Sequence, residues 1–237
     1  MKRVEKHYMS ILGLVLALVV ILSPQAQADL FLFSFSPINY PGSAMPAQLS
    51  LEVKDLGYSG GVYKVEFIFK NNIAPYASGQ ALDSSIESLY FEDGTLLDLA
   101  TVISYPAAGG VVGFAEVFDS PSLPYGESLD PPFTQTTNYF AVDADNPAPF
   151  KGVNLGEAVG IVFDLQTGKE FDDVISALYQ GFEDPLAEEV ESLRIGIHVK
   201  SIHGEPDQSF ILTPVPGAVI LGLLGLGAVG LKLRKFV

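Results

Sequence analysis

The stretch 63-YKVEFIFKNN-72 decides the fold class, because apolar and polar residues alternate along it. One side of an extended chain would carry the apolar set Tyr63, Val65, Phe67 and Phe69, and the other side would carry Lys64, Glu66 and Lys70. Successive side chains of a β-strand point to opposite faces of the sheet, so this pattern is typical of a strand with one buried face. The stretch therefore predicts a half-buried antiparallel strand that ends at Asn71 and Asn72.

Short alternating or apolar runs of the same kind occur on both sides of this stretch. They are residues 48–55, 86–91, 95–105, 110–118, 137–144, 157–165, 193–202 and 209–212. Links rich in Gly and Pro, such as 120-SPSLPYGESLDPPF-133, separate them. About nine strands joined by turns favour an all-β fold for residues 29–213, an antiparallel β-sandwich of the jelly-roll or immunoglobulin-like kind. A closed barrel is the alternative that the pattern leaves open.

One segment, 167-TGKEFDDVISALYQG-181, has the periodicity of a helix. Its apolar residues Phe171, Val174, Ile175 and Leu178 recur at helical spacing. Thr167 and Glu170 match a capping box, and Gly181 is a stop signal. The segment predicts one short helix that packs on the sandwich.

The N-terminal residues have the order of a secretory signal peptide. Basic residues at positions 2, 3 and 6 precede an apolar run from Ile11 to Leu22, and Ala26-Gln27-Ala28 follows. This order of basic, apolar and small-residue segments predicts that residues 1–28 are a signal peptide, which signal peptidase removes after Ala28. We therefore expect an exported protein.

The C-terminus has the features of a short membrane segment. Residues 217–231 are apolar and rich in glycine, and Lys232, Arg234 and Lys235 follow them. As a helix these residues would rise about 22 Å, against a hydrocarbon core of about 30 Å. Basic residues favour the cytoplasmic side, so the three basic residues predict a stop at that side and place residues 29–213 outside the cytoplasm.

The same end, 214-PVPGAVILGLLGLGAVGLKLRK-235, resembles the PEP-CTERM sorting signal of Gram-negative bacteria. The resemblance implies that Pro214, Val215 and Pro216 are the recognition triplet and that the membrane helix begins at Gly217. It also implies that an exosortase, a membrane-embedded transpeptidase-like enzyme, cuts near the triplet. Val215 stands where the family usually has Glu. A plain single-pass anchor is the alternative interpretation.

Residues 85–99, 142–165 and 193–211 also resemble exported domains that precede this signal. The resemblance implies a β-sandwich and a destination at the cell envelope, the cell surface or an exopolysaccharide matrix. It implies no particular activity for the domain.

Composition argues against several classes of function. Six of the 13 basic residues and one of the 28 acidic residues lie in the two end segments, which leaves 7 basic and 27 acidic residues between them. A middle domain with a formal charge of −20 would repel nucleic acid, so no nucleic-acid partner is expected. The chain has no Cys and no nucleophile-elbow, phosphate-loop or dinucleotide motif. We therefore expect a protein that is not an enzyme.

Few residues are candidates for metal or catalytic chemistry. His198, His203 and Glu205 match no standard zinc spacing, and His198 is expected on the outer face of its strand. Asp143 and Asp145 resemble the start of an EF-hand loop, but Pro147 stands where a third oxygen ligand belongs. A looser Ca²⁺ site that Asp130 or Glu157 completes is the only cofactor that the sequence leaves open.

Tyrosines near loops provide the alternative to a purely structural role. Tyr76, Tyr105, Tyr125 and Tyr139 could stack on sugar rings, although such residues usually pack on sheet faces. The sequence thus predicts a non-enzymatic surface or matrix protein. The alternative is a secreted carbohydrate-binding module that contacts exopolysaccharide, with or without Ca²⁺.

Overall fold

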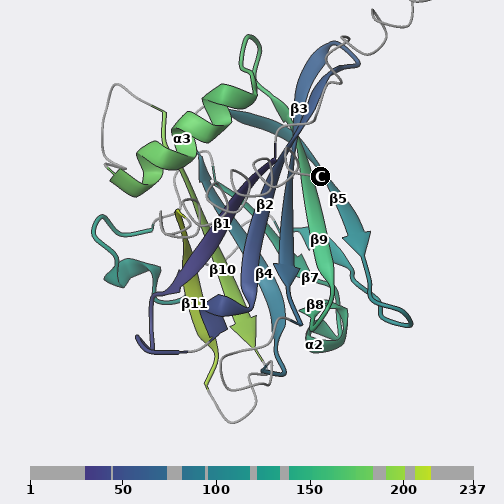
Figure 1. The fold of residues 1–237 in the computed structure, drawn as a ribbon, viewed down its shortest axis with the longest axis vertical. Coiled ribbons are helices and arrows are strands. Elements are labelled where there is room, and N and C mark those ends of the chain that lie inside the picture. Colours follow the sequence, from purple (N-terminus) through teal and green to yellow (C-terminus); the bar gives the residue numbers. More distant parts are fainter. Residues whose placement is uncertain are drawn as a thin grey trace, which may run out of the picture.

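A computed structural model describes residues 30–43, 45–73, 82–93, 96–117, 122–133, 139–183, 191–200 and 206–214 (Figure 1). The strands in these ranges are β1 (Leu30–Pro37), β2 (Leu49–Ser59), β3 (Val62–Asn71), β4 (Ser85–Asp93), β5 (Leu97–Tyr105), β6 (Phe114–Glu116), β7 (Tyr139–Ala144), β8 (Val153–Asn154), β9 (Ala158–Leu165), β10 (Leu193–Lys200) and β11 (Gln208–Pro214). The helices are α2 (Ala148–Lys151), α3 (Phe171–Glu183) and the short 3₁₀ turns Met45–Ala47 and Gly126–Ser128.

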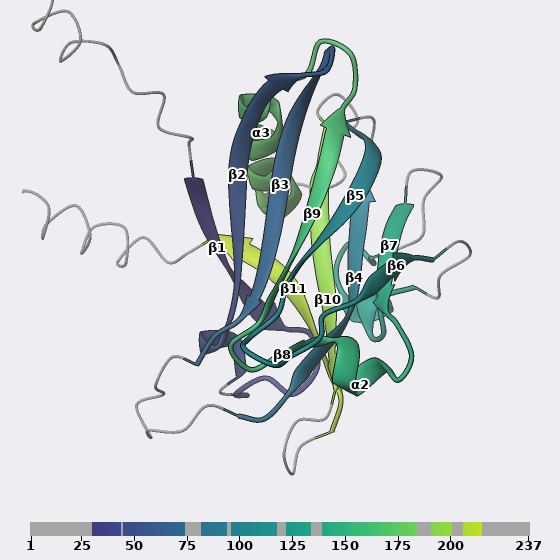
Figure 2. The ribbon, with the colours of Figure 1, turned by 90° about the vertical axis from the view of Figure 1, so that its right-hand side faces the viewer.

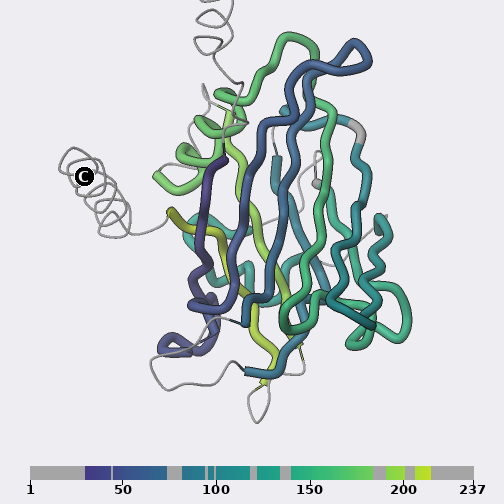
Figure 3. Tube along the Cα trace, turned by 45° about the vertical axis from the view of Figure 1, so that its right-hand side comes forward, coloured from purple at the N-terminus to yellow at the C-terminus, as the bar shows by residue number. Residues whose placement is uncertain are grey.

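The strands form one antiparallel sheet that curls into a half-barrel (Figure 3). Its order is β5-β9-β3-β2-β1-β11-β10-β4-β7-β6, and β8 pairs with β4. The expected all-β, antiparallel class is confirmed, and all nine expected strands are present. The expectation of two separate sheets differs from the structure, because β1 and β11 join the two halves by hydrogen-bonded pairing.

The core lies between the two halves of the curled sheet. The ring of Phe91 on β4 lies 5.5 Å from that of Phe67 on β3, and Phe140 on β7 lies 5.0 Å from Phe163 on β9. These contacts are edge-on, the arrangement that aromatic rings favour. Burial of apolar side chains from both halves on one another is thus the main source of stability.

Strand β1 was not expected from the sequence, although it completes the core. Phe33 and Phe35 are buried, whereas Leu30 and Leu32 are exposed on the other face. Apolar residues on both faces hide the two-residue period that marks a half-buried strand.

Helix α3 confirms the expected helix and corrects both of its ends. All four expected apolar residues are buried, and Phe171 and Phe182 pack on Phe31 and Phe33 of β1. Thr167 is not the cap; instead, the Asp173 carboxylate accepts a hydrogen bond of 2.8 Å from the backbone N–H of Glu170. Gly181 does not end the helix, which continues to Glu183.

The physical role of Gly181 is close packing. A Cβ atom at this position would lie 2.4 Å from the backbone oxygen of Leu193 on β10. Glycine therefore allows the helix to approach the strand, and the sequence alone does not separate this role from that of a helix stop.

A second, smaller core lies on the outer face of β4, β7 and β10. Residues 122–133 cover this face, where Leu123 and Phe133 are buried against Tyr90 and Ala141. Gly196 on β10 leaves room for Leu123, because a Cβ there would lie 2.5 Å from the Leu123 side chain. Strands β4, β7 and β10 therefore have buried residues on both faces.

None of the helices within the described ranges is long and apolar enough to cross a membrane. The predicted signal peptide (1–28) and the predicted membrane helix that begins at Gly217 both lie outside those ranges.

Candidate functional site

The two ends of the folded domain are neighbouring strands in the middle of the sheet. Strand β11 pairs antiparallel with β1, with Phe33 opposite Pro214 and Pro37 opposite Phe210 (Figure 2). The hydroxyls of Ser34 and Thr213 lie 3.3 Å apart across the pair. Antiparallel pairing brings the start of β1 and the end of β11 to the same end of the sheet.

The predicted processing residues flank this strand pair. Pro214, the first residue of the triplet, is the exposed last residue of β11. At the other terminus, β1 begins two residues after Ala28. The remaining processing and stop residues lie outside the described residues: Ala26, Ala28, Val215, Pro216, Gly217, Lys232, Arg234 and Lys235.

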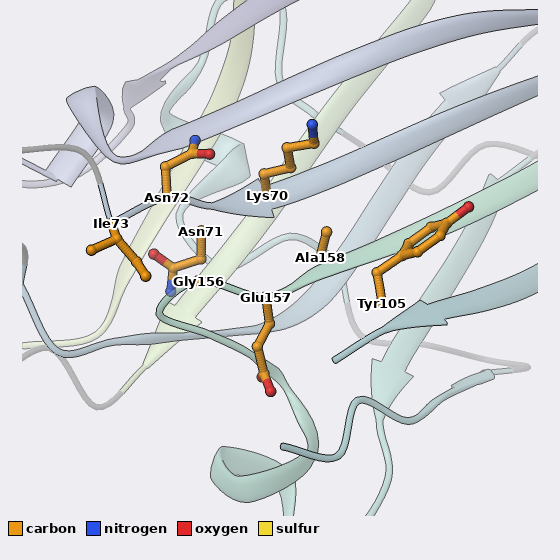
Figure 4. Close-up of a pocket in the computed structure, with 8 residues that line it drawn as sticks. All are labelled: Lys70, Asn71, Asn72, Ile73, Tyr105, Gly156, Glu157 and Ala158. Carbon is orange, nitrogen blue, oxygen red and sulfur yellow. The ribbon is translucent and has the colours of Figure 1, made fainter. Parts of the chain in front are cut away.

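A hollow of about 400 Å³ lies where β3, β9 and β5 meet their connecting loops (Figure 4). Its lining residues are Lys70, Asn71, Asn72, Ile73, Tyr105, Gly156, Glu157 and Ala158. Ile73 and Tyr105 are exposed, and Lys70 on β3 and Tyr105 on β5 lie on either side of β9 (Figure 4). The hollow combines apolar surface with amide and ammonium groups. Binding sites for small polar ligands that also have an apolar face commonly have this composition.

Several polar groups of the hollow already have partners within the protein. The Asn72 amide donates hydrogen bonds of 2.9 Å to the Gln48 carbonyl and to Ser50 Oγ. The Lys70 ammonium pairs with Glu52 on β2. Asn71 belongs to a fully buried network with Gln48 and Ser84 that ties β2, β3 and β4 together. A ligand would therefore contact a largely pre-organised surface.

Glu157, which also lines the hollow, joins two loops through its carboxylate. Its carboxylate accepts hydrogen bonds from the backbone N–H of Ala107 at 3.3 Å and of Asn154 at 3.0 Å. It is buried, and Figure 4 shows its side chain directed away from Lys70 and Asn72. Both carboxylate oxygens thus accept hydrogen bonds that join two loops.

Tyr105 is fixed in place by a buried carboxylate. Its hydroxyl donates a 2.5 Å hydrogen bond to Glu66, which is only 3% exposed although it lies on the outer face of β3. This hydrogen bond, together with burial, raises the pKa of Tyr105 to about 12. Gly160 on β9 makes the pair fit, because a Cβ there would lie 2.6 Å from the Glu66 carboxylate. Tyr105 as a whole remains 40% exposed.

Among the candidate tyrosines that the structure describes, only Tyr105 lines this hollow. Tyr125 is exposed beside the 3₁₀ turn on residues 122–133, over the other half of the sheet. Tyr139 begins β7 opposite Glu92. Tyr76 and the side chain of Tyr139 lie outside the described part of the chain. Glu66 on β3 and Tyr105 on β5 are 39 residues apart in the sequence, and no local spacing of residues indicates their hydrogen bond.

Asp143 and Asp145 lie at the end of β7 but form no described metal centre. Asp145 lies 3.6 Å from the Lys151 ammonium on α2, and one buried oxygen of Asp143 has no hydrogen-bond partner. Among the described residues, no group of three or more His, Cys, Asp or Glu side chains could hold a metal ion. His203 and Glu205 lie outside these ranges.

His198 lies on the outer face of β10 as expected, yet it is buried rather than solvated. It is 8% exposed, and its Nδ1 shares a 3.0 Å hydrogen bond with Ser209 Oγ on β11. Burial holds the pKa of His198 below its usual range, and the nearby charge of Lys200 acts in the same direction, whereas Asp207 and Asp143 oppose the shift. The sequence correctly predicts the face of His198 but not its burial there.

The lowered pKa of His198 predicts an acid-sensitive contribution to stability. Above the unfolded-state pKa of about 6.5, the ring is neutral in both the folded and the unfolded chain. In that range His198 does not make the unfolding free energy depend on pH. As pH falls below that value, the unfolded chain binds the proton first, so the unfolding free energy should decrease by at most about 1.4 kcal/mol per pH unit from this group. Urea unfolding at pH 7.5 and at pH 5 measures the loss.

The control for this prediction is His198→Gln, which keeps a hydrogen-bonding side chain but has no titrating ring. Its unfolding free energy should fall less between pH 7.5 and pH 5 than that of the wild type. Equal losses in the two proteins would assign the acid sensitivity to carboxylates alone.

Comparison with known protein families, with curated proteins and with solved structures finds no match to this chain. The fold itself defines an antiparallel β domain with a curled sheet, in which the first and last described strands, β1 and β11, are neighbours at the centre.

Proposed function

We propose that the chain is an exported, non-enzymatic surface or extracellular-matrix protein whose C-terminal segment anchors it in the inner membrane until an exosortase-like enzyme processes it. The destination is the cell envelope, the cell surface or the surrounding matrix. Signal peptidase and the sorting enzyme are the partners of this proposal.

One observation carries the proposal: the folded domain fills the interval between the two predicted processing sites. The first strand begins two residues after Ala28, and the last strand ends on Pro214 of the triplet. Removal of both end segments would leave every described strand intact. A chain built for export and release needs this division between a domain that stays and ends that are removed.

The fold and the charge agree with this role. As part of the proposal, we class the domain with jelly-roll or immunoglobulin-like sandwiches, because the two halves of its sheet face each other across one aromatic core. With 27 acidic residues between the end segments, such a domain should stay soluble once it is released.

A point change in the triplet tests whether the tail is processed. In the producing cells, Pro216→Ala should accumulate full-length protein in the membrane fraction, whereas the wild type should yield a shorter product on an immunoblot. Ala218→Val, which stays apolar within the predicted helix, is the control and should behave as the wild type. A single wild-type band of full length would favour the plain membrane anchor instead.

The hollow at Tyr105 supports a second candidate, a carbohydrate-binding role on the exopolysaccharide. An exposed tyrosine held by Glu66 offers a stacking surface, and Lys70 and Asn72 lie on the same hollow. Rings with amphipathic surroundings are favoured for binding sugars because the ligand also has apolar faces and polar edges.

Tyr105→Ala should weaken retention of the protein on the producer's own polysaccharide by about tenfold, the effect of losing roughly 1.4 kcal/mol. Tyr105→Phe keeps the ring and should retain most of the binding, while Tyr125→Ala, an exposed tyrosine elsewhere, should change nothing. Co-sedimentation with isolated polysaccharide measures the three variants. No retention of the wild type would exclude this role and leave the structural one.

A further inference from the structure

We propose that the end of the domain with the β2–β3 hairpin lies against the phospholipid bilayer while the tail is anchored, and that Leu30, Leu32, Leu56 and Tyr58 contact the lipid. This inference rests on the proposed function, because it assumes a membrane helix that begins at Gly217. We call these four residues the lipid-facing rim.

The tether between the sheet and the membrane is too short to hold the domain away from the lipid. Only Val215 and Pro216 separate Pro214 of β11 from Gly217. Three extended steps span at most about 11 Å. The headgroup layer on each side of a bilayer is about 5–7 Å thick. The end of β11 must therefore lie within a few ångströms of the headgroups.

The hairpin projects farther than this tether can reach. Phe33 is opposite Pro214, and β1 continues for three residues beyond it to Leu30, or about 10 Å. Leu30 is opposite Lys54, and β2 continues for five more residues to Ser59, or about 17 Å. Figure 2 shows the β2–β3 hairpin extending past the start of β1. If the strands stood perpendicular to the membrane, the hairpin tip would enter the bilayer. If the domain tilted, the outer face of β1 and β2 would lie on the bilayer surface.

The side chains on these surfaces are suited to lipid contact. Leu30 and Leu32 are 52% and 49% exposed on the face of β1 opposite to α3, and Tyr58 in the hairpin is 73% exposed. Leu56 lies beside it and is 37% exposed. Leucine and tyrosine are favoured at membrane interfaces, where tyrosine has an apolar ring and a polar hydroxyl.

Charge also favours this orientation. Lys54, Lys64 and Lys70 lie on the outer face of β2 and β3, and each pairs with an acidic residue. The face next to the lipid-facing rim is therefore close to neutral, although the domain is strongly acidic. An anionic bilayer would repel this face less than the rest of the surface.

The absence of cysteine allows a direct test, because each introduced thiol is the only one in the chain. The protein without its signal peptide, residues 29–237, carries Tyr58→Cys, is labelled with a fluorophore and is placed in nanodiscs of phosphatidylethanolamine and phosphatidylglycerol that contain a headgroup quencher. Phe150→Cys is the matched control, since it is an equally exposed aromatic position on α2, at the other end of the sheet (Figure 1). Leu30→Cys is a second test position.

We expect several-fold stronger quenching at Tyr58→Cys and Leu30→Cys than at Phe150→Cys. A label on Leu224→Cys, inside the predicted membrane helix, reports insertion of the tail in a parallel sample with an acyl-chain quencher. Quenching at Leu224→Cys with equal quenching at the other three positions would overturn the lipid-facing rim and leave the proposed function intact. No quenching at Leu224→Cys would overturn both.

Discussion

The Phe91→Ala variant should lose about 3–5 kcal/mol of unfolding free energy, the usual cost of removing a buried phenylalanine ring. Phe91 is fully buried, and its ring lies 5.5 Å from Phe67, 5.8 Å from Phe69 and 5.0 Å from Phe163. It therefore joins β4 to the opposite half of the sheet. Because a typical domain is stable by only about 5–15 kcal/mol, much of the folded population should be lost on mild heating.

Urea unfolding of the wild type and the variant measures this loss. Phe150→Ala is the matched control, because Phe150 is 76% exposed on α2 and its removal should change stability by less than about 0.5 kcal/mol. A loss at Phe91 as small as that at Phe150 would mean that the two halves of the sheet do not share one core.

In the Pro216→Ala background, where unprocessed protein should accumulate, deletion of residues 217–237 should move the protein from the membrane pellet to the soluble exported fraction. The segment 217–231 contains eight Val, Ile and Leu residues. At about 0.3–0.6 kcal/mol each they favour insertion by roughly 2–5 kcal/mol, so the membrane-bound share should fall more than about tenfold. Fractionation of the producing cells followed by immunoblotting measures the change.

Two controls make the deletion informative. Strand β11 ends at Pro214, so the deletion removes no described strand, and the truncated protein should unfold at the same urea concentration as the processed wild type. Deletion of Phe236 and Val237 alone keeps the apolar run and its basic residues and should leave the distribution unchanged. Membrane association of the longer deletion at the level of the undeleted Pro216→Ala protein would remove the case for a C-terminal anchor.

Much of the fold could be predicted from local patterns. The alternation in 63-YKVEFIFKNN-72 and the apolar spacing around Phe171 and Val174 indicate a strand and a helix that the structure contains. These patterns are visible because each element has one buried face and one solvated face. Where both faces are apolar, as in β1, the periodicity disappears and the strand is missed.

Long-range pairing is the part that the sequence does not predict. The β1–β11 pair joins residues about 180 positions apart, and it changes two separate sheets into one curled sheet. The packing of residues 122–133 on Tyr90 and Ala141 and the hydrogen bond between Tyr105 and Glu66 arise in the same way. No local spacing of residues indicates these contacts, because they depend on the order of strands in the sheet.

Mass spectrometry of the protein isolated from the cell surface and the surrounding matrix tests the central claim most directly. The account predicts a mature chain that begins at Asp29 and ends within the triplet or at Gly217, so that the folded domain is all that remains. An extracellular product that still begins at Met1, or that still ends in Phe236 and Val237, would contradict it.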